Sequence, residues 1–138
     1  MSPRILILGL LAAIALVPFR VARAELPPAV YEELQAKAPE VLEVEITRVA
    51  LNKRDDENRR NISVFADATV TGVTRSQSGI EVGDKISLRY MTFKIIQMGF
   101  VGPGPIPQVE AGKRYRIWFK KAGSHFYPAA QGRSISSD

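Results

Sequence analysis

The chain has 138 residues, 19 basic and 14 acidic side chains, a formal charge of +5 at pH 7 and no cysteine. The lack of cysteine excludes disulfide bonds, thiol chemistry and acylation of an N-terminal cysteine. The length suffices for one domain with one hydrophobic core but not for two.

The first 24 residues have the order of a cleavable secretory signal peptide. Arg4 precedes an apolar run over residues 5–17, and the small residues Ala22 and Ala24 follow it. A charged start, an apolar middle and a small-x-small exit predict cleavage after Ala24. The apolar stretch over 5–19 is shorter than the roughly 20 residues of a membrane-spanning helix, so an uncleaved anchor is the weaker interpretation.

The remaining 114 residues carry 16 basic and 14 acidic side chains, because the signal contains three arginines and no acid. A net charge this small gives no electrostatic reason to expect a nucleic-acid partner. Because the first 24 residues are expected to be a cleaved signal, we expect a periplasmic or secreted protein with no stable membrane anchor after cleavage. Its expected partner is a protein or a small ligand outside the cytoplasm.

The exported part is predicted to begin with a helix and to continue in strands. Residues 25–39 carry apolar side chains at helical spacing and are bracketed by Pro28 and Pro39. Residues 41–49 alternate between apolar and polar side chains, which predicts a half-buried strand. The wholly polar segment 52–61 cannot enter a core, and we interpret it as an exposed hairpin connection.

A second long strand is predicted over 62–75. Gly72 interrupts it, and a glycine within a long strand is typical of a bulge or sharp bend. Similar turn sequences precede two further alternating strands, which begin near Ile86 and Tyr115. A last short strand is expected over 125–128, where Pro128 ends it.

These elements predict a mainly β fold, namely a small five-stranded antiparallel OB-like barrel with one short N-terminal helix. Closure into a barrel removes exposed strand edges without the help of disulfides. The expected organisation is a signal over 1–24, a helix over 25–39 and a barrel with a short tail over 40–138.

Three segments carry a family resemblance, which covers roughly residues 41–127: 68–73, Gly83-Asp84-Lys85-Ile86, and 112–119. Their order resembles the netrin-like and tissue-inhibitor-of-metalloproteinases group of OB-fold modules. The resemblance implies an OB fold and protease inhibition. In those inhibitors the mature chain begins with a cysteine that reaches the protease metal, whereas here it would begin with Glu25, so that mechanism does not carry over.

No catalytic, metal or cofactor site is predicted. His125 is the only histidine, and it has no second histidine to share a metal ion. Ser124 is its neighbour in sequence, and neighbours on a strand point to opposite faces, so we expect no nucleophile and base pair. The acidic run 55–57 lacks the alternating ligands and the glycine of a calcium loop, and we interpret it as a solvated turn.

One loop is the strongest candidate for a binding surface. Residues 99–108 are rich in glycine and proline, and rigid loops present binding groups at low entropic cost. The candidate binding residues are Phe100, Pro103, Pro105, Trp118, His125, Tyr127 and Arg133. The alternative for Trp118 is a structural one, in which it fills the barrel or covers its end.

The leading functional interpretation is an exported, non-enzymatic binding or interaction module. One alternative is a protease inhibitor of the netrin-like type. The other is a small hydrolase or metal-binding protein centred on His125, which clustering with Asp67, Asp84 or Glu110 would favour.

Overall fold

The computed structural model describes residues 26–95 and 104–138. The predicted cleavage residues Ala22 and Ala24, together with Glu25, Phe100 and Pro103, lie outside this part. The described elements are α1 (Pro28–Lys37), β1 (Glu40–Asp55), β2 (Arg59–Ser76), β3 (Lys85–Ile95), β4 (Arg114–Ala122), β5 (His125–Pro128), the short 3₁₀ helix η1 (Gln131–Arg133) and β6 (Ile135–Ser137).

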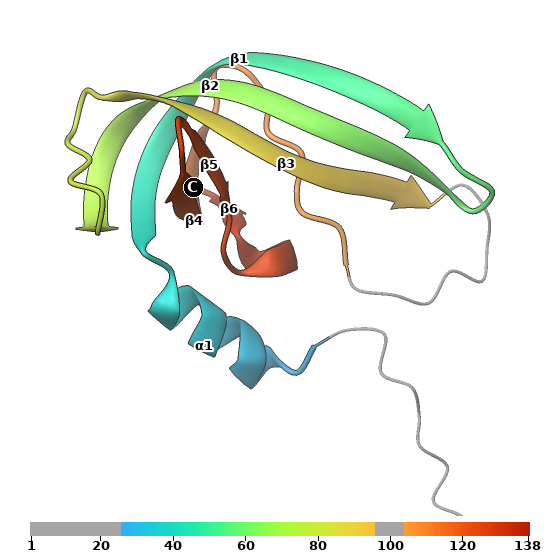
Figure 1. Cartoon of the computed structure of the whole chain (residues 1–138), viewed down its shortest axis with the longest axis horizontal. Helices are drawn as coiled ribbons and strands as arrows, with labels where there is room; N and C mark the ends of the chain where they lie inside the picture. The colour runs from blue at the N-terminus through green and yellow to red at the C-terminus, as the bar shows by residue number, and fades with distance from the viewer. Residues whose placement is uncertain (1–25, 96–103) are drawn as a thin grey trace, which may run out of the picture.

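Five strands close into a barrel in the order β1-β2-β3-β5-β4, because β1 also pairs with β4, and β6 extends the sheet beside β4 (Figure 1). The predicted OB-like barrel with one N-terminal helix is confirmed. One pair differs from the prediction, since β3 and β5 run parallel and meet at Leu88 and Phe126. A closed ring with an odd number of strands cannot alternate in direction throughout, so at least one pair must be parallel.

Strand β1 serves two parts of the sheet. Its first residues, Glu40 to Glu45, pair with β2 on one side and with β4 on the other. Two register shifts in the β1–β2 pairing flank Gly72, which confirms the predicted bend. A Cβ at Gly72 would lie 2.7 Å from Oε2 of Glu43, so the close approach of the two strands favours glycine there.

Beyond the barrel, β1, β2 and β3 continue together as a long curved arm (Figure 1). The prediction of a connection over 52–61 was too long, because β1 and β2 pair as far as Asp55 and Arg60 and only residues 56–58 form the tip. The segment is exposed as expected. Strand pairing uses backbone groups and so needs no apolar side chain, and Asp55 and Arg60 add an ion pair of 2.7 Å across the arm.

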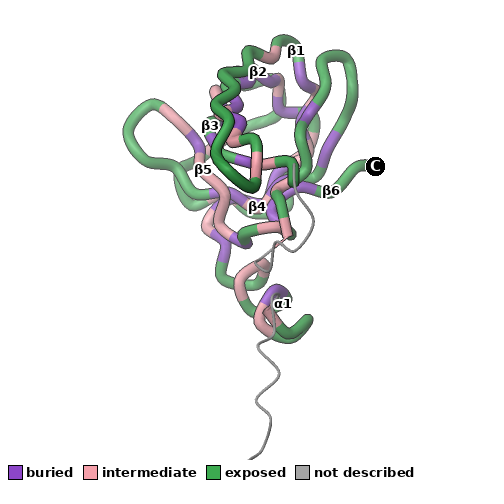
Figure 2. Tube along the Cα trace, turned by 90° about the vertical axis from the view of Figure 1, so that its right-hand side faces the viewer, coloured by how far each residue is buried: buried purple, intermediate pink, exposed green. Residues whose placement is uncertain are grey.

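The core lies inside the barrel, where alternate residues of every long strand are buried (Figure 2). Phe119 is fully buried there and meets Tyr90 edge to face, with ring centroids 6.4 Å apart.

Helix α1 packs below the barrel through its buried Tyr31 and half-buried Leu34. The Arg75 guanidinium donates to the carbonyls of Ala38 and Gln35 at 2.8 and 2.9 Å, which attaches the end of α1 to β2. Within the described residues, no helix is both long and apolar enough to cross a membrane.

Candidate functional site

The described candidate residues do not gather at one surface. Trp118 is half-buried on β4 and faces away from the interior, which the neighbouring Phe119 fills instead. Pro105 is exposed in the loop that precedes β4. Arg133 lies in η1 with its guanidinium 5.8 Å from the Tyr31 ring centroid, and its carbonyl accepts a hydrogen bond from Gln35. Arg133 thus docks the helix onto the barrel.

His125 has a partner that strand alternation did not predict. Its Nδ1 lies 3.0 Å from the Ser124 hydroxyl oxygen. The expectation that the two side chains point apart was wrong, because Ser124 lies in the turn between β4 and β5, which Gly123 enters at φ +61°, and not on the strand.

The carboxylates that would support chemistry at His125 have other partners. Asp67 pairs with Arg48 at 3.2 Å, Asp84 accepts the backbone N–H of Glu81 at 2.9 Å, and Glu110 pairs with Lys113. In residues 26–95 and 104–138, no three acidic, histidine or cysteine side chains form a cluster that could hold a metal ion. The arrangement around His125 therefore gives no orienting acid to a Ser124–His125 pair.

Two apolar grooves adjoin one another on the side of the barrel. The first, which we call the β3 groove, has a volume of about 460 Å³ and is lined by Ser63, Val64, Phe65, Arg89, Tyr90, Met91, Ile106, Tyr127 and Pro128. The second, the helix groove, has a volume of about 470 Å³ and is lined by Leu34, Lys37, Ala38, Pro39, Ile106, Lys120, Pro128, Ala129 and Gln131. The two share Ile106 and Pro128, so they meet at these residues.

The β3 groove exists because β5 is short. Strands β3 and β5 meet only at Leu88 and Phe126, and β5 ends at Pro128, which has no backbone N–H to donate. Strand β3 continues to Ile95 with β2 as its partner on one side. Among the described residues, no strand pairs with the other side of β3 beyond Leu88.

Side chains of β3 hold the loop that forms one wall of this groove. The Tyr90 hydroxyl donates to the carbonyl of Pro107 at 2.8 Å and accepts the backbone N–H of Val109 at 3.0 Å. Thr92 donates to the carbonyl of Ile106. Burial raises the pKa of Tyr90 to about 12. Ile106 is thereby fixed where the two grooves meet.

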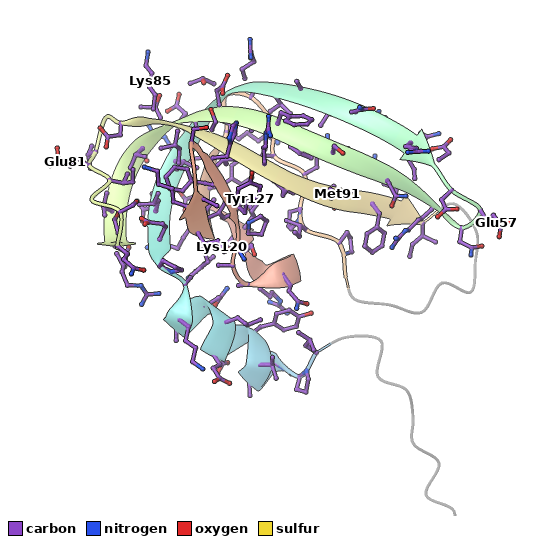
Figure 3. The ribbon with its side chains drawn as sticks, viewed as in Figure 1. Glu57, Glu81, Lys85, Met91, Lys120 and Tyr127 are labelled. Atoms are coloured by element: carbon purple, nitrogen blue, oxygen red, sulfur yellow. The ribbon has the colours of Figure 1, made fainter. Side chains whose placement is uncertain are left out.

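The outer face of the barrel carries a row of aromatic and basic side chains at this point. Phe65 on β2 lies opposite Arg89 on β3, whose guanidinium is 5.1 Å from the Phe65 ring centroid. Tyr127 on β5 lies opposite Lys120 on β4. Because Leu88 pairs with Phe126, the next residues, Arg89 and Tyr127, are neighbours on the outer face. Figure 3 shows Tyr127 and Lys120 near the middle of the view and Met91 farther along β3.

Sequence reasoning found part of this site. Tyr127 was a candidate, and the described part of the 99–108 loop contributes Ile106. Phe65 and Met91 were missed, although the signal was present, since each occupies the polar phase of an alternating strand and must be exposed there. Comparisons with protein families, with curated proteins and with solved structures find no match, so the netrin-like resemblance stays a prediction.

Proposed function

We propose that the protein is an exported, non-enzymatic binding module that holds an extended segment of a partner polypeptide in the β3 groove. The observation that carries the proposal is an apolar groove beside a stretch of β3 with a strand partner on one side only. The signal-like residues 1–24 support export.

An open strand edge suits an extended peptide. Such a segment adds to the sheet through its main-chain hydrogen bonds, while pockets beside the edge receive alternate side chains. Here the place next to β3 is filled by β5 up to Phe126 and is vacant of described strands beyond it. A bound segment would lie along β3 beyond this point.

The lining residues suit this role. Met91 is 64% exposed, Phe65 is 41% exposed, and Tyr127 is half-buried. Aromatic and methionine side chains are enriched at protein interfaces because they bury much apolar area. Isolated exposed apolar residues are common on protein surfaces, but these three line one groove.

The alternatives have less support. Protease inhibition rests on the sequence resemblance alone. A hydrolase or metal protein centred on His125 would need carboxylates that are engaged elsewhere in the described structure.

The test is selection of peptides from an unbiased display library, followed by titration of the selected peptides against wild type and two variants. Met91→Asp places a charge at the groove and should weaken binding by about tenfold or more, because the apolar contact is lost. Val82→Asp is the matched control, since Val82 is 65% exposed and lies in the turn between β2 and β3. Figure 3 places the adjacent Glu81 at the opposite end of the barrel from Met91.

Selected peptides that bind both variants as tightly as wild type would contradict the groove assignment. Failure of the library to yield any peptide above background would contradict the proposed function itself.

A further inference from the structure

We infer that the segment held in the β3 groove is acidic, with carboxylates within reach of Arg89 and Lys120 and apolar side chains turned into the groove. This inference rests on the proposed function and specifies the chemistry of the partner.

The charged side chains that line the two grooves are all basic. None of the described residues that line them is aspartate or glutamate, whereas Lys37, Arg89 and Lys120 are basic. Lys37 is paired with Glu33 at 2.6 Å. Arg89 and Lys120 have no carboxylate partner within residues 26–95 and 104–138, so a bound anion would meet two uncompensated cations.

Two other cations on the same face of β4 are neutralised. On β4, Arg114 and Arg116 pair with Glu45 and Glu43 of β1, at 3.4 and 2.9 Å. Lys120 is on the same face of β4 but lies opposite Tyr127 instead of an acid. Along this face of β4, the cations beside β1 are thus paired with acids, whereas Lys120 beside the groove is not.

The cross-strand positions fix where the carboxylate would lie. Adjacent strands are about 4.8 Å apart, so the backbones of Arg89 and Lys120 lie about 10 Å apart on either side of β5. Tyr127 of β5 fills the place between these two backbones, and β6 occupies the same edge of β4 at Ile117, so a bound segment would lie along β3 beyond Pro128. An outward side chain opposite Met91 would then be a diagonal neighbour of Arg89, about 7–8 Å away, which the long arginine side chain can span. Lys120 would meet the segment from the adjoining helix groove.

A polypeptide fits this site better than other anionic polymers. The groove contacts of Met91, Ile106 and Pro128 are aliphatic, and the half-buried Tyr127 offers a single ring, whereas single-stranded nucleic acid stacks successive bases on several rings. The Phe65 ring is already covered by the Arg89 guanidinium. The open edge of β3 offers backbone groups, which an extended peptide satisfies in register.

The test uses three short capped peptides that alternate valine with glutamate, glutamine or lysine, titrated against the purified protein by fluorescence anisotropy. The glutamate peptide should bind about tenfold more tightly than the glutamine peptide, about threefold for each of two partly exposed ion pairs. The lysine peptide should bind weakest, and added salt should reduce the preference for glutamate.

A charge swap separates recognition from simple damage to the fold. The double variant Arg89→Glu with Lys120→Glu should prefer the lysine peptide over the glutamate peptide, a gain that a misfolded protein cannot show. Lys120→Glu alone should weaken the glutamate peptide, whereas Lys85→Glu should not. Lys85 is the matched control, because it is an exposed lysine of β3 that lies outside both grooves.

The outcomes distinguish this inference from the proposed function. Equal binding of the glutamate and glutamine peptides would overturn the inference. Library-selected peptides that need Met91 but show no acidic preference would overturn it while the binding function stands. A short oligothymidine that binds more tightly than the glutamate peptide, with the same dependence on Lys120, would overturn the assignment of a polypeptide partner in favour of single-stranded nucleic acid.

Discussion

Replacement of Tyr90 by phenylalanine should loosen the wall of the β3 groove at a predictable cost. The substitution keeps the ring, and with it the edge-to-face contact with Phe119, but removes the hydroxyl. The backbone N–H of Val109 then loses its partner in a site where Val109 is 1% exposed, which costs about 1–3 kcal/mol. The lost bond to the Pro107 carbonyl adds about 0.5–1.5 kcal/mol. The free energy of unfolding should therefore fall by about 2–4 kcal/mol.

Urea denaturation near neutral pH measures this change, and Tyr115→Phe provides the comparison. The Tyr115 hydroxyl accepts the backbone N–H of Glu110 at 3.0 Å, but Glu110 is exposed, so water can replace the lost partner. Tyr115→Phe should cost about 1 kcal/mol or less. Equal losses in the two variants, or a Tyr90→Phe protein as stable as wild type, would refute the reasoning from burial.

The same hydroxyl gives a pH dependence with a defined sign. Its pKa is raised from about 10 in the unfolded chain to about 12 in the folded one, so the folded state holds the proton more tightly. The contribution to stability is complete below about pH 10 and is lost as the pH rises to about 12, by about 3 kcal/mol in all. Denaturation across this range should show the fall in wild type and a shallower one in Tyr90→Phe. Parallel pH profiles for the two proteins would show that Tyr90 is not the source of the loss of stability at high pH.

Three further predictions follow from single features. Glu40 is 1% exposed; its Oε1 accepts the Ser78 N–H at 2.8 Å and its Oε2 has no hydrogen-bond partner. Glu40→Gln should therefore leave the free energy of unfolding unchanged or raise it by about 1 kcal/mol. Glu40→Ala should lower it by about 2–3 kcal/mol, because the Ser78 N–H loses its acceptor. Urea denaturation checks the order, and a Glu40→Gln protein less stable than Glu40→Ala would contradict it. Gly83 has φ +94° and open space around it, so Gly83→Ala should cost about 1–2 kcal/mol from backbone strain alone; an unchanged melting curve would exclude such strain. N-terminal sequencing of the protein from the exported fraction should read Glu25 first, and an intact N-terminus would contradict cleavage after Ala24.

The strands could be predicted where apolar and polar side chains alternate. They could not be predicted where all side chains of the paired strands are polar. Ile86, Leu88 and Tyr90 are all buried, as their spacing predicts. The arm beyond Arg54 has no apolar phase, and its strands are stabilised by pairing with each other, a contact that a one-dimensional pattern does not contain. The bend at Gly72 was accessible because only a close approach or a bulge explains glycine inside so long a strand.

The candidate site was harder to predict, because it depends on which strands become neighbours. Tyr127 and Lys120 are linked by a tight turn, so their pairing follows from local sequence. Arg89 is a neighbour of Tyr127 only through the parallel contact of β3 with β5, and no periodicity in either segment indicates it. The row of Phe65, Arg89, Tyr127 and Lys120 therefore needed the closed barrel to become visible.

Barrel closure and the proposed site have a common cause. A ring of five strands requires one parallel pair, and here that pair is made by the shortest strand of the ring, which Pro128 ends two residues after Phe126. Because β5 is so short, the second half of β3 has one described partner strand, β2, even though the barrel is closed. A longer β5 would close this edge, so extending β5 past Pro128 should abolish peptide binding. We conclude that the brevity of β5, more than any single side chain, makes the β3 groove available to a partner.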